Sequence, residues 1–376
     1  MRILFTAGGT GGHFYPIVAV SRELKKIIEE ERILGMKMYY IGPDDFGHDV
    51  LKKDEIDVRI VISGKMRRYA SLRNIVDVFK VIGGTVQAFF VLFSIMPDVI
   101  FSKGGYGSLP VVIVSFFYGI PLIIHESDSR PGIVNRVASL FADRIAISFE
   151  SSIPFFFSKK KIALTGNPIR KNILGGSKEA GQEEFSIFSR RPVILVMGGS
   201  QGSEIINKTL MGALRELTKS FEIIHQTGRE NFEGVRGEAS VILNQEEKTY
   251  YHPVAFFDDR MLRSVYALAD ICVSRAGSGS IFEIAAAGKP SILIPLKNSA
   301  QEHQKQNAYE YSQYGAAAII EEDNLIPSVF LNEIRKLLND KERLALMTDR
   351  AKKFSKPDAA ETIAREVMKL GIHSYE

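Results

Sequence analysis

Residues 274–295 read SRAGSGSIFEIAAAGKPSILIP and decide the fold, because a glycine-rich turn, a helix and a strand follow the apolar strand 271–273. Ser280 is a candidate N-cap with Glu283 at capping-box spacing, and Gly288 ends the helix. A helix N-terminus placed after a strand, without bulky side chains in front, favours anions. Glu283 would repel a phosphate but suits sugar hydroxyls, so a nucleotide with a ribose satisfies both demands. An ordinary strand–turn–helix connection is the alternative.

The same alternation of strand and helix continues along the whole chain. Glycines cluster directly after strands, and the first helix is predicted from Pro16 to about Glu31. This pattern indicates an α/β fold with two Rossmann-like, doubly wound parallel sheets and ligand sites at the carboxyl ends of the strands. The predicted strands are 2–6, 37–41, 56–62, 98–102, 122–125, 144–147, 161–164, 192–197, 221–225, 251–254, 271–273, 291–294 and 316–320.

Two domains are predicted, with a boundary at the GNP sequence of residues 166–168. Residues 178–184 are polar and are expected to form a surface loop, after which a strand and a Gly-Gly turn begin the pattern again. We therefore expect one domain at 1–167 together with a C-terminal helix at 352–376, and a second at 168–351. The C-terminal helix is amphipathic, and its apolar face carries Ala360, Ile363, Ala364 and Val367.

Composition limits the classes of function. The chain has 376 residues, 45% hydrophobic and 24% charged, with a net charge of +4, as in a soluble globular protein rather than a nucleic-acid-binding one. Cys272 is the one cysteine and no metal-ligand cluster of histidines is visible, which fits a reducing compartment. No signal peptide is expected. The apolar runs 86–96 and 111–124 fall short of the about 20 residues of a spanning helix.

The glycine-rich sequence GGTGGH at 8–13 follows the first strand. It matches neither the dinucleotide fingerprint nor the P-loop, which leaves a backbone nest for an anion with one imidazole beside it. His13 could be a general base or a phosphate donor, or could bond its own turn. The KGGY sequence at 103–106 follows another strand and is either a second nest or a plain loop.

Polar side chains follow two further strands and the domain boundary. His125-Glu126-Ser127-Asp128 could line a cleft with Glu126 as base, or form a salt-bridged loop. Arg170 could bind phosphate or be a surface charge. The amides of 303–308 suit sugar hydroxyls, or could be a polar first helical turn. Because no Asp-x-Asp triplet is present, we expect helix dipoles and side chains to neutralise phosphate charge without an obligate metal.

A basic segment, with Arg67, Arg68 and Tyr69, precedes an apolar segment that contains Phe89. Such a combination can dock on an anionic bilayer surface. The alternative is a buried helix with a solvated basic face.

Taken together, these motifs resemble the GT-B-fold N-acetylglucosaminyltransferases of bacterial peptidoglycan synthesis, the MurG family, which make lipid II from lipid I. Eight motifs occur in family order and cover nearly the whole chain. They are GGTGGH at 8–13, KGGY at 103–106, HE at 125–126 with PG at 131–132 and NR at 135–136, GNPIR at 166–170, GGSQG at 198–202, HQTG at 225–228, SRAG at 274–277 with Glu283, and Gln304 with NA at 307–308.

The resemblance implies two domains that face a central cleft, with UDP-N-acetylglucosamine held mainly by the second. Glu283 would bind the ribose, the backbone near Phe257 the uracil, and His303 with Gln304 the sugar. Arg170, Ser200 and the turn 278–280 would bind the diphosphate. The implied donor contacts are Thr10, Gly11, Gly12, Asp128, Arg170, Ser200, Phe257, Ser278, Gly279, Ser280, Glu283, His303 and Gln304.

The implied acceptor is the undecaprenyl-diphosphate-linked muramyl-pentapeptide, lipid I. Its 4-hydroxyl would displace UDP with inversion in one step, deprotonated by His13 or, second, by Glu126, without a cofactor. The protein would be peripheral on the cytoplasmic face of the cell membrane and serve cell-wall biogenesis, cell shape and division, with cell-wall synthesis proteins as candidate partners. The implied acceptor contacts are Gly9, Lys103, Gly104, Gly105, Tyr106 and Asn135, and the membrane contacts Arg67, Arg68, Tyr69 and Phe89.

The sequence departs from the family pattern in three places. Ser127 and Asp128 stand where Gln-Asn is frequent, which leaves the role of Asp128 open, and His303 replaces a common Gln. The stretch 259–266 is slightly longer than usual, so the uracil contact is only approximately assigned. Two alternatives remain: a GT-B transferase that uses a UDP-sugar on another lipid such as diacylglycerol, and a non-catalytic nucleotide-sugar-binding subunit.

Overall fold

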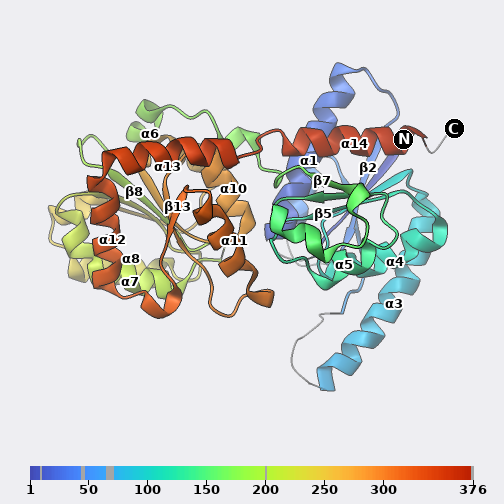
Figure 1. Ribbon diagram of the computed structural model, residues 1–376, viewed down its shortest axis with the longest axis horizontal. Helices are drawn as coiled ribbons and strands as arrows, with labels where there is room; N and C mark the ends of the chain where they lie inside the picture. Colours follow the sequence, from blue (N-terminus) through green and yellow to red (C-terminus); the bar gives the residue numbers. More distant parts are fainter. Residues whose placement is uncertain (9–10, 44–46, 65–71, 200, 374–376) are drawn as a thin grey trace. The chain divides into compact units, whose positions relative to one another are not determined.

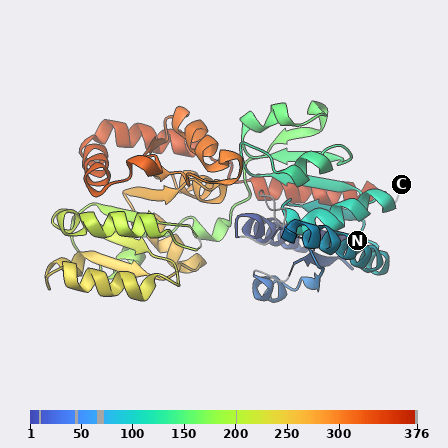
Figure 2. The ribbon, with the colours of Figure 1, turned by 90° about the horizontal axis from the view of Figure 1, so that it is seen from below.

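The computed structural model describes residues 1–8, 11–43, 47–64, 72–199 and 201–373. The chain divides into two units (Figures 1 and 2). Unit 1 comprises Met1–Ile169 and Lys356–Glu376, and unit 2 is Arg170–Ser355. In the prediction from the sequence, the first domain ends at 167 and resumes at 352. Both boundaries between the units lie within a few residues of these positions.

Unit 1 contains a seven-stranded sheet whose paired strands are all parallel, in the order β3-β2-β1-β4-β5-β6-β7. This is the predicted doubly wound arrangement. The strands are β1 (Arg2–Thr6), β2 (Lys37–Gly42), β3 (Asp57–Ile60), β4 (Val99–Ser102), β5 (Leu122–Glu126), β6 (Arg144–Ile147) and β7 (Ile162–Leu164). The helices are α1 (Gly11–Glu30), α2 (His48–Lys53), α3 (Leu72–Ile95), α4 (Leu109–Tyr118), α5 (Ile133–Ala138) and α14 (Ala359–His373).

Unit 2 repeats the plan with six parallel strands in the order β10-β9-β8-β11-β12-β13. They are β8 (Val193–Met197), β9 (Glu222–Gln226), β10 (Tyr251–Val254), β11 (Ile271–Arg275), β12 (Ser291–Ile294) and β13 (Ala317–Ile319). The helices are α6 (Lys178–Phe185), α7 (Glu204–Thr218), α8 (Phe232–Ile242), α9 (Asp259–Leu268), α10 (Ser278–Ala286), α11 (His303–Gln313), α12 (Pro327–Asn339) and α13 (Lys341–Phe354).

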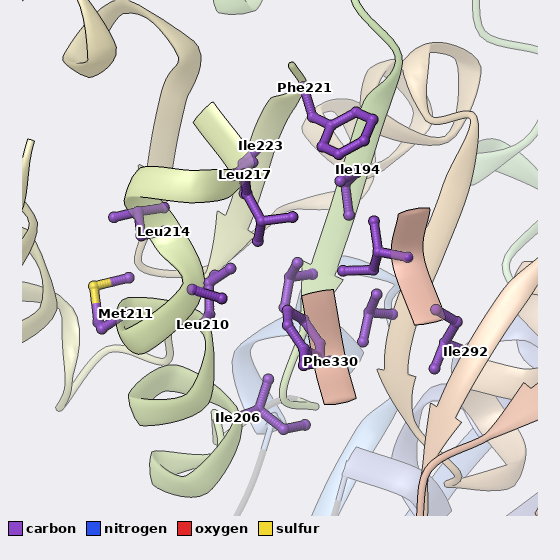
Figure 3. Packing of buried hydrophobic residues seen from close by; sticks show 14 of the residues in the cluster. Ile194, Ile206, Leu210, Met211, Leu214, Leu217, Phe221, Ile223, Ile292 and Phe330 are labelled. Atoms are coloured by element: carbon purple, nitrogen blue, oxygen red, sulfur yellow. The ribbon is translucent and has the colours of Figure 1, made fainter. Parts of the chain in front are cut away.

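The central strands of both sheets are buried on both faces, as parallel strands with helical crossovers require, whereas the edge strands β3 and β7 contain no buried residue. In β1, Ile3 and Phe5 join the core that includes α1 and α14, whereas Leu4 joins the core on the opposite face. In unit 2, Ile194 packs with Leu210 of α7 and Phe330 of α12 (Figure 3). The alternation of side chains along each strand therefore divides each unit into two apolar layers around its sheet.

The last helix of the chain, α14, packs in unit 1 against α1, β1 and β4. The predicted apolar face is buried, with Ala360, Ile363, Ala364 and Val367 at most 2% exposed. The end of the chain is thus part of the first core, as its amphipathic pattern indicates.

Two local predictions were wrong. Helix α1 begins at Gly11 rather than at Pro16, which lies inside the helix. Only the first four N–H groups of a helix have no intrahelical acceptor. Proline at the sixth position therefore costs α1 one backbone hydrogen bond. Residues 178–184 form α6 instead of a loop, because Ser177 caps the helix by accepting from the Ala180 N–H at 3.0 Å.

Helix α3 is longer than the apolar runs in the sequence indicated. Among the described residues, it is the one helix that is long and apolar enough over Val76–Ile95 to cross a membrane, and 22% of its most apolar window is buried. Core helices of soluble proteins can meet the same criterion. Asp77, Lys80 and a Gly-Gly pair interrupt the apolar runs in the sequence without interrupting the helix, which is why no candidate span was predicted there.

Candidate active site

The order of strands reverses between β1 and β4 in unit 1, and between β8 and β11 in unit 2. Ligands of doubly wound sheets bind in the crevice at this position, beyond the carboxyl ends of the strands. The glycine-rich sequences predicted to bind substrates follow these four strands. Each unit therefore has one candidate half-site.

In unit 1 the two glycine-rich loops are in direct contact. The Gly8 N–H donates to the Gly104 carbonyl at 2.8 Å. A Cβ added to Gly105 would lie 2.9 Å from the Gly8 Cα and 3.4 Å from Cδ2 of His13. Gly105 also has φ of +82°, a conformation that L side chains rarely adopt. The glycines thus bring the imidazole of His13 beside the loop after β4.

The other predicted residues of these loops have mixed positions. Gly11 is buried at the start of α1, and Gly12 beside it is exposed. Tyr106 is half-buried at the first position of the short 3-10 turn Tyr106–Ser108. Gly9 and Thr10 lie outside the described residues.

Glu126, at the end of β5, is 4% exposed and accepts three hydrogen bonds from the chain that follows. Its donors are the Asp128 N–H at 3.0 Å, the Gly132 N–H at 3.1 Å and the Asn135 amide at 2.9 Å. Burial, followed by the nearby Asp128, raises the pKa of Glu126 above its ordinary range. These hydrogen bonds fix the loop 127–132 to the end of β5. The side chain of Asp128, a predicted contact of the UDP-sugar, is half-buried in this loop.

Lys103 is buried beneath the same loop, with 1% of its surface exposed. Its Nζ donates to Ser127 Oγ at 2.7 Å. Burial lowers the pKa of Lys103 to about 8, and the charges of Glu126 and Asp128 partly oppose this shift. Its ammonium is therefore directed toward the protein interior rather than toward solvent, which the sequence did not indicate.

In unit 2 the predicted capping box is wrong. Helix α10 begins at Ser278 after the N-cap Gly277, and no side chain caps it. Ser280 is instead the third residue of the helix. A Cβ added to Gly277 or Gly279 would meet no atom within 4 Å. The two glycines thus leave open space on the outside of the first turn, whose N–H groups have no intrahelical acceptor, as an anion site requires.

Arg170 lies between two carboxylates of unit 2. Its guanidinium donates to Asp259 Oδ1 at 2.5 Å and to Glu283 Oε1 at 2.8 Å. Arg170 is 8% exposed, and Asn172 donates to the second oxygen of Asp259 at 2.7 Å. Arg170 and Glu283 were both predicted site residues, but Asp259 was not, because nothing in the sequence links positions so far apart.

A second ion pair joins Arg275, the last residue of β11, to the turn after β13, and it also contacts the loops after β8 and β12. Arg275 donates to Ser203 Oγ at 2.8 Å and to Glu322 Oε1 at 2.7 Å. The other oxygen of Glu322 accepts from the Lys297 N–H at 2.9 Å. The pair is mostly buried, with 10% and 14% of the two side chains exposed. Sequence reasoning missed Glu322, which lies in an unremarkable acidic turn.

The other residues of unit 2 that were predicted to contact the UDP-sugar form hydrogen bonds within the unit. The Phe257 N–H donates to Gln226 Oε1 at 3.3 Å. Gln304 accepts from the Leu296 N–H at 3.1 Å, and His303 Nδ1 lies 2.6 Å from the Ala300 carbonyl. Ser200 lies outside the described residues. In the described part of the chain no group of three His, Cys, Asp or Glu side chains could hold a metal ion.

Comparison with known proteins decides the family. Residues 3–147 match the glycosyltransferase family 28 N-terminal domain, and residues 193–363 match the C-terminal domain of that family. A Clostridium kluyveri protein is 36% identical over 89% of this chain and 91% of its own length. A Thermoanaerobacter protein is 33% identical over 98% of this chain and 100% of its own. Both are named UDP-N-acetylglucosamine–N-acetylmuramyl-(pentapeptide) pyrophosphoryl-undecaprenol N-acetylglucosamine transferase.

The chain belongs to this transferase family. It is therefore a glycosyltransferase, as predicted. MurG of Acinetobacter baumannii has a similar structure, with a TM-score of 0.73 and 24% identity over 98% of this chain and 99% of that one.

The UDP-GlcNAc 2-epimerase of Neisseria meningitidis also matches, with a TM-score of 0.66 and 16% identity over 98% of this chain and 100% of that one. Such structural likenesses show the GT-B fold alone, which transferases and epimerases share. Sequence identity over the full length separates the transferase from the epimerases.

Proposed function

We propose that this protein transfers N-acetylglucosamine from UDP-N-acetylglucosamine to the 4-hydroxyl of the muramyl sugar of lipid I, which yields lipid II and UDP. The observation that carries the proposal is full-length similarity at 33–37% identity to transferases named for this donor and acceptor. The geometry of the two half-sites supports it. A single displacement by the acceptor hydroxyl would invert the anomeric centre.

Unit 2 would hold the donor. Its first-turn N–H groups at 278–280 suit the diphosphate, because they end beside open space. Glu283 suits the ribose hydroxyls as a hydrogen-bond acceptor. Arg170 already binds Glu283 and Asp259, so we assign it the orientation of Glu283 as well as charge balance for the departing UDP.

Unit 1 would hold the acceptor and its base. We assign the base to His13, which is half-buried and next to the contact between Gly8 and Gly105. An imidazole titrates near neutral pH and can take a hydroxyl proton. Glu126 is assigned a positioning role, since its two oxygens already accept three hydrogen bonds. Lys103 would support the same loop from beneath through Ser127.

We propose that no metal or other cofactor takes part. Helix N-termini and the Arg170 guanidinium can neutralise a diphosphate without a cation. In a turnover assay, this proposal requires that EDTA leave the rate unchanged.

We propose that unit 1 also docks on the cytoplasmic membrane surface. The support is a group of exposed apolar side chains on α3 and α4, since contiguous exposed apolar patches mark interaction sites. Lys80 on the same helix is exposed and could meet anionic headgroups. Arg67, Arg68 and Tyr69, predicted to contact the membrane, lie outside the described residues. The exposed side chains of this membrane-docking face are Val76, Val78, Phe79, Ile82, Val86, Phe89, Phe90, Phe116 and Phe117.

The test is release of UDP from UDP-N-acetylglucosamine with a soluble lipid I analogue, with and without EDTA. Turnover that requires the analogue and survives EDTA supports both the acceptor and the metal-free mechanism. Turnover only with diacylglycerol would replace lipid I by another lipid acceptor. No release with either acceptor, despite donor binding, would favour a non-catalytic subunit.

A further inference from the structure

A groove whose exposed surface is entirely hydrocarbon lies between α3 and α4, and the proposed reaction leaves it without a role. It has a volume of about 290 Å³. The one hydroxyl in the lining, that of Thr85, donates to the Val81 carbonyl at 2.8 Å. The groove therefore offers a ligand only aliphatic and aromatic surface. It is lined by Thr85, Val86, Phe89, Phe90, Val114 and Phe117.

The groove is formed by packed helices rather than by a loose surface. Figure 1 shows α3 running beside α4 and then projecting beyond the rest of unit 1. Val114 at the floor is fully buried, while Phe90 and Phe117 at the rim are 67% and 70% exposed. The Tyr118 hydroxyl donates to the Phe89 carbonyl at 3.1 Å, which ties the helices together beside the groove.

The short distance between the groove and the glycine-rich loop after β4 fits a lipid tail as the occupant. Helix α4 begins at Leu109, directly after the loop and turn 103–108. At 1.5 Å of rise per residue, Val114 lies about 8 Å and Phe117 about 12 Å along α4 from this start. A lipid whose diphosphate sits at the loop can reach the groove with the first few units of an extended tail.

We propose that this groove binds the diphosphate-proximal isoprene units of the polyprenyl acceptor. The inference rests on the proposed function, since the relatives are named for a pyrophosphoryl-undecaprenol acceptor. Branched, unsaturated isoprene units present methyl groups and flat double bonds that pack on phenylalanine rings and valine methyls. A tail held here would fix the acceptor's diphosphate at the loop and leave the distal tail in the bilayer. The groove shares Val86, Phe89, Phe90 and Phe117 with the membrane-docking face, and we assign it the tail in addition to that face's contact with the bilayer.

The test compares two soluble muramyl-diphosphate acceptors, one with a methyl group and one with three isoprene units, below micelle-forming concentrations and without membranes. The readout is the ratio of their KM values within each variant. In the wild type, we expect the tail to lower KM about tenfold, as burial of one or two methylene groups implies. Phe117→Ser, which removes a wall, and Val86→Trp, which fills the groove, should bring this ratio close to one.

Two control variants separate the groove from the bilayer. Phe79→Ser removes an equally exposed ring of α3, 68% exposed and outside the groove, and should weaken binding to anionic vesicles while keeping the tail ratio. Phe157→Ser, 78% exposed elsewhere in unit 1, should change neither.

Three outcomes would overturn the proposal. The tail gives the wild type no advantage, Phe79→Ser lowers the ratio as far as Phe117→Ser does, or the groove variants affect vesicle binding alone. The last result would assign the groove to bilayer acyl chains. If no acceptor yields UDP at all, the proposed function itself fails, which is distinct from a tail without effect on a working enzyme.

Discussion

The two units place glycine-rich loops at the same topological position but pack them differently. In unit 1 the loops after β1 and β4 close on each other, and an added Cβ at Gly105 would come within 2.9 Å of Gly8. In unit 2 an added Cβ at Gly199, Gly277 or Gly279 would meet nothing within 4 Å. Unit 2 also has a glycine contact between backbones, since an added Cβ at Gly202 would lie 2.9 Å from the Gly228 Cα. The difference is therefore local: glycine closes the loops after β1 and β4 on each other, but leaves room at Gly199 and at the start of α10.

The charged residues of the two units also differ in how far they are exposed to solvent. Unit 1 buries Lys103 and Glu126 beneath its loop, with 1% and 4% exposed. Unit 2 holds its carboxylates closer to solvent, with 14% of the Glu283 side chain and 30% of that of Asp259 exposed. One topology can therefore supply either a rigid support for a reacting group or an open site for a nucleotide. Variants in unit 1 should therefore change kcat or stability, and variants in unit 2 donor KM.

The largest effect is expected at the imidazole beside the closed loops. His13→Ala should lower kcat by about 10²–10⁴-fold, because general base catalysis is lost. The KM for UDP-N-acetylglucosamine should change little. Steady-state UDP release checks both constants, and His252→Ala in unit 2 is a histidine control with retained kcat. Undiminished turnover of His13→Ala would exclude His13 as the base.

Alanine substitutions at two glycines, one in each unit, should have contrasting effects on stability. Gly105→Ala should destabilise the fold by about 1–3 kcal/mol, because its φ of +82° and ψ of 164° are tolerated almost only by glycine. Gly279→Ala should leave stability unchanged or raise it by up to about 1 kcal/mol, since it lies within α10. Urea unfolding of the two variants measures this contrast.

Gly279→Ala should nevertheless raise donor KM about tenfold, because its methyl occupies the open space at the first turn. If Gly279→Ala binds donor as the wild type does, the first turn of α10 does not hold the diphosphate. Equal stability losses in both variants would remove the contrast between the units.

The third prediction concerns pH. Burial holds the pKa of Lys103 at about 8, below its ordinary 10.5. Below pH 8 both folded and unfolded chains carry this proton. Between pH 8 and 10.5 the unfolded chain binds more protons, so this group makes stability rise with pH, at most by about 1.4 kcal/mol per pH unit.

Lys103→Met should remove that rise, while the exposed Lys26→Met should keep it. Urea unfolding at several pH values between 7 and 10.5 compares the slopes. A wild-type slope that survives in Lys103→Met would assign the rise to other groups and weaken the contrast in burial between the units.

The smallest effect is expected at the ion pair of unit 2. Asp259→Asn should raise donor KM about two- to fivefold, since a partly exposed pair contributes about 1 kcal/mol or less. Glu216→Gln disturbs the exposed pair with Lys219 on the same unit and should leave KM unchanged. Titration of UDP by calorimetry gives an independent affinity. Matching affinities for Asp259→Asn and wild type would show that Asp259 does not position Arg170.

The fold could be predicted because apolar strands and glycine turns are local signals. The strands of both sheets differ from the predicted ranges by only a few residues. Local signals also misled, since Ser280 and Glu283 match a capping box although the backbone of Gly277 begins the helix. The polar stretch 178–184 has no apolar stripe that would have indicated a helix.

The site could be predicted only as separate pieces. The motifs named Arg170 and Glu283, but their ion pair joins residues far apart in the chain, which one sequence cannot pair. A lysine beside a glycine-rich loop suggests an exposed phosphate ligand, and nothing in the sequence shows that Lys103 is covered by the loop after β5. Burial and pairing are properties of the tertiary structure, so one sequence cannot supply these parts of the site.

Helix α14 has a consequence for how the chain is made. Unit 2 is one continuous segment, Arg170–Ser355, whereas unit 1 is completed only by Lys356–Glu376. During synthesis on the ribosome, all residues of unit 2 are available before α14 is made. At that stage the apolar surface of α1 and β1 that packs against Ala364 and Val367 is still uncovered. The domain begun first is thus finished last, and a nascent chain stopped shortly before its end would expose the first core to chaperones or proteases.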